Sequence, residues 1–492
     1  MTATESCSLV AGISENRMEH HDRVDVASSP TSVVAAQMLQ EDAVMEPIVL
    51  NDWEAEDASG GDVEGWICPA SKKSMRTINP IRAIVDPIAK NIQTGEQRGD
   101  GKDLISLALG DPTVGKNLPP CPLAINEVVQ AAQNGPHAAG YVHACGTTAA
   151  REAIARYHSY ERHSIGAENV IVANGCSGAL EIALTALLDP NTILLVPQPG
   201  FPLYQVIAES HGASVLPYHL DPDRDWQVDL DHLERLLMQS NGRCLHGDSR
   251  GIVINNPSNP TGSVFSRSHL IDIVELCQRY RVPIVSDEIY GSLVFGDRVH
   301  HPVAEVAAAL GRRVPVITAS GLAKQFLLPG WRIGWITFHD NIYGSLAEVQ
   351  AGAHRLAQVI LGASHLAQSA IPALLDGCNP TLALWKENLR KTLANQAELL
   401  CRRLNECHGL EVALPQGAMY AMVRIATELL DVANDKEFSQ LLLQEENVFV
   451  LPGSAFGMSN VFRVVYCLPP SVLEESTRRI AAFCRRHSKK HW

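Results

Sequence analysis

Short, continuous runs of apolar residues alternate with amphipathic stretches from about residue 105 onward. The apolar runs predict buried strands at 170–173, 192–196, 251–254, 283–285 and 314–317. Between the strands, segments such as 179–188 carry apolar residues at helical spacing. Continuous apolar strands separated by helices are typical of a mostly parallel sheet that helices cover on both faces. The pattern therefore predicts an α/β fold for this part of the chain.

After about residue 370 the pattern changes to a long amphipathic helix at 381–407 and a closing helix at 470–485. Strand-like pieces lie between them, at 419–423, 448–451 and 462–466. This order predicts a smaller α+β domain, to which residues 74–118 contribute. We expect four parts: a tail at 1–70, an amino-terminal arm and part of the small domain at 71–120, a large domain at 121–370, and the rest of the small domain at 371–492.

The first 65 residues differ from the rest in composition and charge. They hold 14 of the 54 acidic residues and 2 of the 40 basic ones, so they account for most of the net charge of −14. Without a helical or strand period they cannot bury enough apolar surface to offset chain entropy. We expect a disordered acidic tail. It is either a solvated leader without a role or a regulatory segment, for example one that controls turnover.

Bulk properties narrow the class of protein. Hydrophobic residues make up 46% of the chain and the mean hydropathy is −0.01. No run is apolar enough to span a bilayer, and the acidic start resembles neither a secretory signal nor a mitochondrial presequence. The 12 cysteines form no CxxC pair and no zinc-spaced Cys/His cluster, which predicts free thiols and no metal. Outside the tail the sequence has no stripe of basic residues that could bind nucleic acid. Because no targeting segment is recognised, we expect a cytoplasmic location.

The most informative segment runs from Ser320 to Trp335 and reads SGLAKQFLLPGWRIGW. It follows the apolar run at 314–317, presents Lys324, breaks at a Pro-Gly pair and returns Arg332 eight positions after the lysine. A lysine that leaves the end of a buried strand is suited to form an imine with an aldehyde cofactor. A nearby arginine is suited to bind that cofactor's phosphate.

Other strand ends carry polar residues, and ligands bind at the carboxyl ends of strands in open α/β sheets. Asp287 ends the strand at 283–285 and would be semi-buried, so it needs a cationic partner unless it is a helix N-cap. Asn259 lies in a turn with two Asn-Pro steps, which is either structural or holds its side chain for a ring hydroxyl. The turn from Asn174 to Gly178 is either a plain helix cap or an anion site.

Two more residues have both a structural and a functional interpretation. Phe201 follows the strand at 192–196 and is either a core aromatic or a side chain stacked on a flat ring. Arg463 lies inside the strand-like run at 462–466, where it either faces outward or binds a carboxylate with its planar fork. No single motif is decisive, but their order and spacing are explained by one cofactor.

From about residue 74 to its end the chain resembles the fold-type-I (class I/II) aminotransferases, which use pyridoxal 5'-phosphate (PLP). The segments that carry the resemblance are 76–86, 109–114, 196–204, 255–262, 286–291, 321–335 and 415–420. The Lys324 and Asn259 motifs are shared by the wider class. The sequences of segments 79–86 and 321–332 are more specific to the members of the family that act on tyrosine. The resemblance implies a fold-type-I PLP transferase with a large, PLP-binding domain and a smaller α+β domain.

The resemblance also implies roles for single residues. Lys324 would be the Schiff-base lysine and proton shuttle, Asp287 the partner of the pyridinium nitrogen, and Asn259 and Tyr290 the partners of the ring's O3'. Phe201 would stack on the ring. Phosphate contacts would come from Gly175, Cys176, Ser177, Ser320 and Arg332, and from Tyr141 across a homodimer interface. Substrate contacts would come from Arg463, which binds the α-carboxylate, and from Gly110 and Asn259.

The activity implied is transfer of the amino group of L-tyrosine to 2-oxoglutarate, which gives 4-hydroxyphenylpyruvate and L-glutamate in aromatic amino acid catabolism. One alternative keeps the cofactor and changes the donor to alanine, kynurenine or methionine. A second is a PLP lyase on the same fold, which would not consume an oxo acid. A third is a non-catalytic regulator with this fold. The acidic tail has the wrong charge for the DNA-binding domain that such regulators carry.

Overall fold

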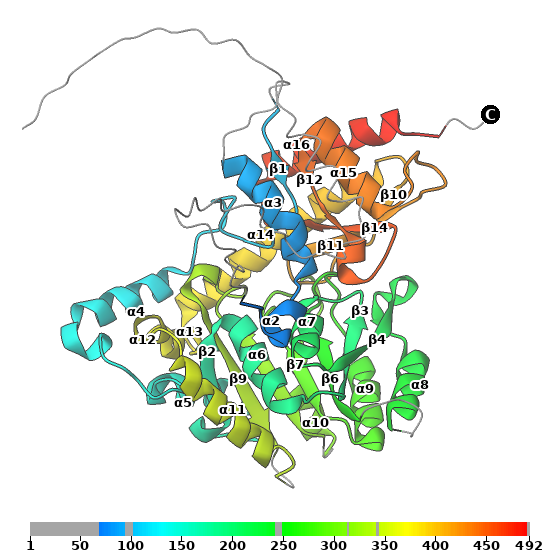
Figure 1. Ribbon diagram of the computed structural model, residues 1–492. Helices are drawn as coiled ribbons and strands as arrows, with labels where there is room; N and C mark the ends of the chain where they lie inside the picture. Colours follow the sequence, from blue (N-terminus) through cyan, green and yellow to red (C-terminus); the bar gives the residue numbers. More distant parts are fainter. Residues whose placement is uncertain (1–67, 94–101, 242–247, 312–313, 341–343, 490–492) are drawn as a thin grey trace, which may run out of the picture.

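The computed structural model describes residues 68–93, 102–241, 248–311, 314–340 and 344–489 (Figure 1). The predicted tail at 1–70 lies outside the described residues except for positions 68–70. One large sheet, covered by helices, occupies the lower half of the view, and a smaller sheet with its own helices lies above it. The fold class is therefore confirmed as a mostly parallel α/β domain joined to a smaller α+β domain. Within the described ranges, no helix combines the length and apolar character needed to cross a membrane.

The large sheet has eight strands in the order β2-β9-β8-β7-β6-β3-β4-β5. Four neighbouring pairs, from β4 to β8, are parallel, whereas β9 is antiparallel to both of its neighbours and β5 is antiparallel to β4. The strands are β2 Val170–Asn174, β3 Ile193–Gln198, β4 Ser214–Asp221, β5 Gln227–Val228, β6 Ser249–Asn255, β7 Ile284–Asp287, β8 Val316–Gly321 and β9 Ile333–His339. The central strands are buried on both faces, which explains their continuous apolar sequences.

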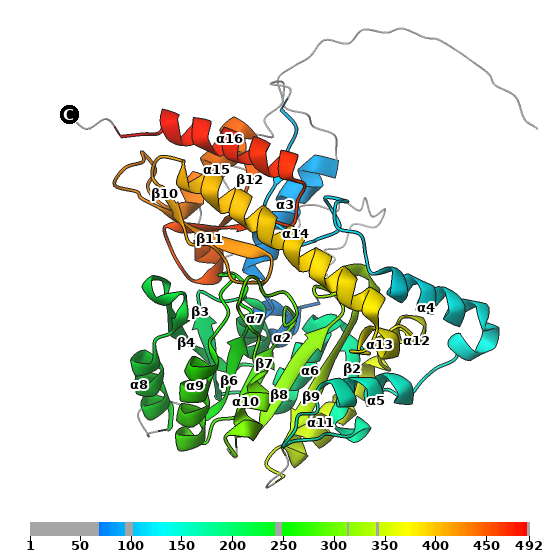
Figure 2. The same cartoon turned by 180° about the vertical axis from the view of Figure 1, so that it is seen from behind.

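Helices cover the two faces of this sheet. One face carries α6 (Gly175–Leu187), α7 (Leu203–Ser210) and α11 (Ala347–Ile360), which lie in front of the strands in Figure 1. The opposite face, seen in Figure 2, carries α8 (Leu230–Asn241), α9 (Arg267–Tyr280) and α10 (Val303–Ala309). At one end of the sheet lie α4 (Pro122–Gln133), α5 (Thr148–Tyr157), α12 (His365–Gln368) and α13 (Ile371–Leu374).

The smaller sheet is antiparallel, with the order β10-β11-β14-β13. Its strands are β10 Leu410–Val412, β11 Tyr420–Ile425, β13 Leu451–Pro452 and β14 Val461–Val465. A separate parallel pair joins β1 (Ile105–Ser106) to β12 (Val448–Phe449), so a segment from the start of the chain lies beside one from its end. The helices here are α3 (Pro80–Gln93), α14 (Pro380–Asn405), α15 (Asp435–Glu446) and α16 (Pro470–Arg486).

The long helix α14 connects the two parts of the molecule. Figure 2 shows it running from the edge of the large sheet up to the small domain. Asn379 caps its start by accepting a hydrogen bond from the Leu382 N–H. The short helix α2 (Lys72–Arg76) contacts α7 of the large domain. Single 3₁₀ turns complete the described elements at Gly135–Ala138, Ala167–Asn169, Pro222–Arg224, Pro329–Trp331 and Gly453–Phe456.

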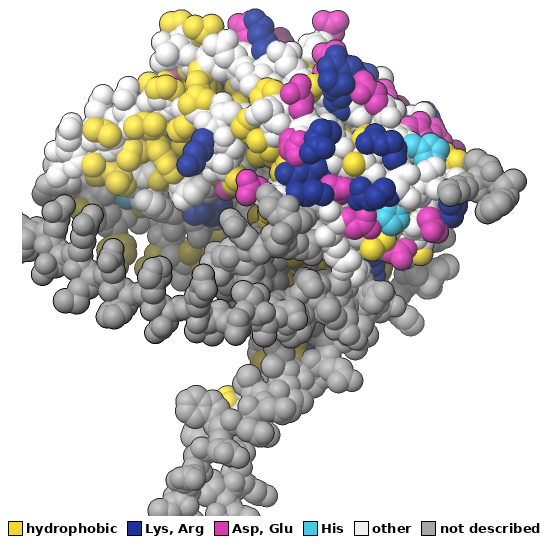
Figure 3. Space-filling model, turned by 90° about the horizontal axis from the view of Figure 1, so that it is seen from above, with side chains coloured by type: hydrophobic (Ala, Val, Ile, Leu, Met, Phe, Trp, Pro, Cys, Tyr) yellow, Lys and Arg dark blue, Asp and Glu magenta, His cyan; other side chains and the backbone are white. Residues whose placement is uncertain are grey.

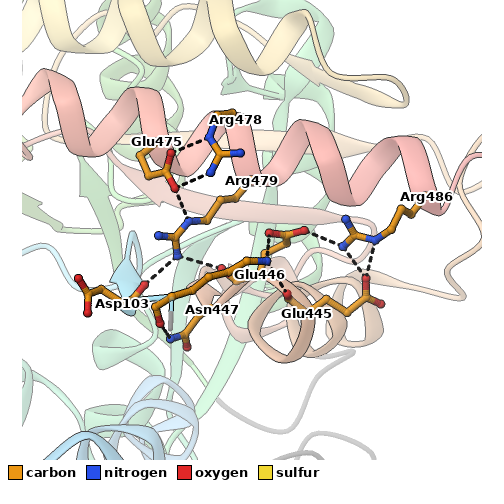
Figure 4. A network of polar contacts seen from close by, with 9 residues as sticks. Asp103, Glu445, Glu446, Asn447, Glu475, Arg478, Arg479 and Arg486 are labelled. Atoms are coloured by element: carbon orange, nitrogen blue, oxygen red, sulfur yellow. Dashed lines mark hydrogen bonds and ion pairs between the residues drawn. The ribbon is translucent and has the colours of Figure 1, made fainter. Parts of the chain in front are cut away.

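A polar network ties the segment just before β1 to α16 (Figure 4). Arg479 of α16 is buried and donates to the Glu475 carboxylate at 2.7 Å, to the Asp103 carbonyl at 2.7 Å and to the Glu446 carbonyl at 3.1 Å. Arg478 donates twice to the same Glu475 but is exposed. Arg479 therefore satisfies two backbone carbonyls, of which that of Glu446 is buried.

We expect Arg479→Met to lower the free energy of unfolding by about 2–4 kcal/mol, because it leaves two carbonyls without their donor and removes one of the donors to the Glu475 carboxylate. Arg478→Met removes a contact to the same carboxylate from an exposed position and should cost less than about 1 kcal/mol. Urea unfolding of the two variants measures the difference. Equal decreases in the free energy of unfolding would show that the contacts of Arg479 stabilise the protein no more than the exposed contact of Arg478.

Candidate active site

Polar residues converge where the parallel strands of the large sheet end. β2 leads directly into α6 at Gly175, β6 leads to the turn that holds Asn259, β7 ends at Asp287, and β8 is followed by Lys324. The small domain adds Arg463 from β14, whose Nη1 donates to the Asn259 Oδ1 at 2.8 Å. The structure therefore brings together residues from five separated parts of the sequence.

Asp287 is buried with a relative exposure of 3%. Its Oδ2 accepts from the Tyr204 hydroxyl at 2.7 Å, and its Oδ1 accepts from the Ile289 N–H at 3.2 Å and from the Cys176 thiol at 3.7 Å. Desolvation raises the pKa of the Asp287 carboxyl, and these hydrogen bonds oppose the rise only in part. Asp287 forms no ion pair with any cation of the described residues. This arrangement fits a flat ligand that brings a protonated ring nitrogen.

Lys324 lies in the turn that follows β8, and it is half buried. Its Nζ donates to the Gly110 carbonyl, which belongs to the segment before α4. Gly110 has no room for a side chain, because an added Cβ would lie 2.0 Å from the Tyr420 hydroxyl. Lys324 and Gly110, which the sequence assigned to the cofactor and the substrate, are therefore in direct contact.

The start of α6 and Arg332 form a small concave backbone site. Gly175 has a φ of +75°, and an added Cβ would lie 2.4 Å from the Arg332 Nη2. The Gly175 N–H donates to the Arg332 carbonyl at 2.9 Å, and the Arg332 Nη2 donates to the Asn174 carbonyl at 3.3 Å. The N–H groups of Cys176 and Ser177 lie in the first turn of α6, where backbone donors are free for an anion. These residues fit a phosphate group.

Arg463 is buried between two aromatic rings. Its guanidinium carbon lies 4.3 Å from the ring centroid of Tyr420 and 4.6 Å from that of Phe456. Besides Asn259 it donates to the Ala108 carbonyl, and its Nε has no hydrogen-bond partner among the described residues. Burial lowers the pKa of this guanidinium, whereas the Tyr420 and Tyr290 hydroxyls raise it. A substrate carboxylate would supply the missing negative charge.

Tyr290 and Tyr420 form a second contact between the domains. Their hydroxyl groups are 2.8 Å apart, and the rings meet edge to face at 5.7 Å. Burial raises the pKa of the Tyr290 hydroxyl well above its ordinary value, so it is a neutral donor at physiological pH. The Asn255 Oδ1 accepts from the Asn259 N–H at 2.7 Å, which fixes the backbone of the neighbouring turn.

Sequence reasoning missed Tyr204 and Tyr420. Tyr204 hydrogen-bonds Asp287, and its ring contacts that of the half-buried Phe201 edge to face at 5.8 Å. Both tyrosines lie in segments that carry the family resemblance, at 196–204 and 415–420. Their place in these segments was the sequence feature that could have marked them as site residues. The Asp287 side chain accepts the Ile289 N–H but does not cap a helix, since no described helix begins there.

Two predicted site residues form no side-chain hydrogen bond to the other site residues among those the structure describes. Tyr141 is 95% exposed. The Ser320 hydroxyl accepts from the Gln325 side chain at 3.1 Å and donates to the Glu288 carbonyl at 3.4 Å, so its polar contacts are with neighbouring protein groups. Among the described residues, no group of three or more His, Cys, Asp or Glu side chains is placed to hold a metal ion.

Comparisons with known proteins agree with this geometry. The family model described as "Aminotransferase class I and II" matches residues 102–480. A tyrosine aminotransferase from Dictyostelium discoideum is 37% identical over 428 residues, which cover 86% of this chain and 98% of that protein. A tyrosine aminotransferase from Mus musculus is 39% identical over 86% of this chain and 88% of that one. The crystal structure of a tyrosine aminotransferase from Leishmania infantum superposes with a TM-score of 0.77 at 32% identity, over 86% of this chain and all of that chain.

The buried Asp287 gives a prediction for the protein stripped of bound small molecules. Because the folded-state pKa is raised, the cost of the charge is absent below the unfolded pKa and grows as pH rises through the folded pKa. At pH 8 the free energy of unfolding of Asp287→Asn should therefore exceed that of the wild type by about 1–4 kcal/mol. Near pH 4 the two proteins should differ little.

The matched control is Asp86→Asn, which alters a carboxylate whose side chain is 62% exposed and should shift stability by less than about 1 kcal/mol. Urea titrations between pH 4 and 8 give both values. An Asp287→Asn variant that is less stable than the wild type at pH 8 would show that the ligand-free site is already charge-balanced.

Proposed function

The chain belongs to the class I and II aminotransferases, a PLP-dependent family, and we propose that it transfers the α-amino group of L-tyrosine to 2-oxoglutarate. The products are 4-hydroxyphenylpyruvate and L-glutamate. The observation that carries the proposal is the buried Asp287 carboxylate, which has no cationic partner among the described residues. It lies where four strand ends of the large sheet meet Arg463 of the small domain. Tyrosine is proposed as the donor because the relatives named above are tyrosine aminotransferases, and this chain is similar to them over most of their length.

PLP supplies a reactive carbonyl and a ring that withdraws electrons from the substrate. In the proposed site Lys324 holds the carbonyl and then moves a proton at the substrate's Cα. Asp287 keeps the ring nitrogen protonated, because a buried carboxylate favours a cation beside it. Asn259 and Tyr290 would bind the hydroxyl of the ring, and Phe201 would stack on the ring.

The remaining residues position the substrate and the phosphate. The N–H groups of Gly175, Cys176 and Ser177, with Arg332, hold the phosphate at the start of α6. Arg463 binds the α-carboxylate in a planar, two-point contact, with Gly110 beside it. Because Arg463 is on the small domain and Lys324 on the large one, substrate binding draws the two together and excludes water from the reacting atoms.

We further propose a homodimer in which Tyr141 completes the phosphate site of the partner subunit. Tyr141 is 95% exposed, which is unusual for a tyrosine and fits a side chain that a second copy covers. Exposed apolar residues on α4, Ile125 and Val129, add to the same end of the molecule. Figure 3 shows hydrophobic side chains gathered over one half of the face seen from above and charged ones over the other half.

A reducing, cytoplasmic location is also part of the proposal. The ten described cysteines are all free thiols, and eight of them are buried. The division into a tail, an arm, a large domain at 121–370 and a small domain at 71–120 and 371–492 is proposed with it. The β1–β12 pair supports this division, because it places the segment near residue 105 beside the small domain.

Lys324→Ala should lower kcat for tyrosine and 2-oxoglutarate by at least about 10³-fold, because the lysine moves the proton. Lys391→Ala, an exposed lysine on α14, is the matched control and should leave kcat unchanged. The assay measures 4-hydroxyphenylpyruvate and glutamate, which the proposal requires in equal amounts. A panel of amino donors tests specificity, and tyrosine should have the highest kcat/KM.

Retained turnover in Lys324→Ala would remove the central assignment. Equal or higher kcat/KM for alanine, kynurenine or methionine would keep the chemistry and reject tyrosine as the preferred donor. Keto acid formed from an amino acid without consumption of 2-oxoglutarate would favour a lyase.

A further inference from the structure

A cavity of about 560 Å³ lies between the large domain and α14. Its walls come from the end of α5, the loop from Glu288 to Pro302, the turn around Lys324 and the first half of α14. We call it the α14 cavity. Its lining residues include Tyr157, Tyr160, Glu288, His300, Lys386 and Arg390. This volume is in the range of small-molecule sites.

The α14 cavity and the candidate active site lie on either side of one turn. Asp287 directs its carboxyl toward Cys176 and Tyr204. The next residue, Glu288, directs its carboxyl the other way, where Oε1 accepts from the Ser286 hydroxyl at 2.8 Å and from the Val303 N–H at 3.0 Å. The α14 cavity is therefore distinct from the cofactor site, although the two share this turn.

Two cations of α14 face the cavity without a protein anion. Lys386 and Arg390 are one helical turn apart, a spacing at which like charges repel. Among the described residues neither forms an ion pair, and the Lys386 Nζ lies over the Phe326 ring, 4.7 Å from its centroid. Burial, and then the Arg390 charge, lower the pKa of the Lys386 ammonium. An anion between them would relieve both effects.

The walls also present polar atoms that lack partners. The Ser292 Oγ and the His300 Nε2 are buried and have no hydrogen-bond partner within the described part of the chain. His300 Nε2 lies 3.9 Å from the Glu288 Oε2, which is too far for a hydrogen bond. Since buried polar atoms are normally paired, these two indicate a bound molecule that meets them.

The rest of the lining suits an organic body. Tyr157, Tyr160, Val294, Pro302 and Ala383 contribute aromatic and aliphatic surface. A third cation at the rim, Arg298, is already paired with Asp225 at 3.3 Å. The unpaired positive charge is thus confined to α14, whereas the buried Glu288 carboxyl and most of the apolar and hydrogen-bonding surface are on the opposite side.

We propose that the α14 cavity binds a small organic anion. Its carboxylate or phosphate group lies between Lys386 and Arg390, and its body lies against Tyr157, Tyr160 and Pro302. Ser292 and His300 bind its polar atoms. Because Lys386 and Arg390 are on the helix that connects the domains, the bound anion fastens that helix to the turn carrying Asp287 and Tyr290. The site goes beyond the proposed transamination and does not depend on the identity of the amino donor.

The test uses full-length holoenzyme and two probes, inorganic phosphate and phenylacetate, with binding measured by isothermal titration calorimetry. Lys386→Gln and Arg390→Gln should each weaken binding at least about tenfold, because each removes a charge-assisted contact. Lys391→Gln changes an exposed lysine of the same helix, already paired with Glu387, and should leave binding unchanged. Ala383→Trp keeps both cations but fills the cavity, and should abolish the same binding.

The variants distinguish the outcomes. Phenylacetate binding that all three cavity variants weaken supports the organic anion, even if phenylacetate also occupies the active site of every variant. Variant-sensitive binding of phosphate alone overturns the organic part of the proposal and leaves an inorganic anion site. Binding of neither probe, or binding that the cavity variants do not change, overturns the proposal. Circular dichroism and thermal unfolding confirm that each variant is folded.

Discussion

The candidate active site is organised around a carboxylate that the protein buries without a cation of its own among the described residues. Asp287 ends a central strand, is 3% exposed and is held by a tyrosine, a thiol and a backbone N–H. Such a group costs stability until a cation binds beside it. Its position at the end of the parallel strands, next to a lysine and a helix start, makes a protonated, phosphate-bearing ring the ligand that fits. Fold, cofactor and chemistry are therefore linked through this one side chain.

The two faces of the Asp287–Glu288 turn differ in chemistry. One face is directed to the cofactor site, and the other to a cavity lined by Lys386, Arg390 and His300. The small domain contacts the first face through Arg463 and Tyr420, while α14 borders the second. Movement of α14 relative to the large domain would thus change the contacts on both faces of the turn. In the proposed scheme the substrate contacts one face of this turn and the anion contacts the other.

Much of this could be predicted from the sequence, because the signals were local. Apolar runs at 251–254 and 314–317 correspond to β6 and β8 within a few residues, and the helix expected at 381–407 is α14 at Pro380–Asn405. The antiparallel direction of β9 and the β1–β12 pair could not be predicted, because strand direction and pairing are set by tertiary packing. The Asp287–Tyr204 bond and the Tyr290–Tyr420 contact join residues 83 and 130 positions apart, and no periodicity reports such contacts. The α14 cavity likewise exists only once α14 lies against the turn after β7.

The most direct test of the account is the visible absorption spectrum of the purified holoenzyme before and after tyrosine is added without any oxo acid. The account predicts a band from the cofactor bound to Lys324, and loss of that band as the cofactor takes up the amino group and one equivalent of 4-hydroxyphenylpyruvate appears. A band that tyrosine leaves unchanged would contradict tyrosine as the donor. A protein that gains no band after addition of PLP would contradict the account as a whole.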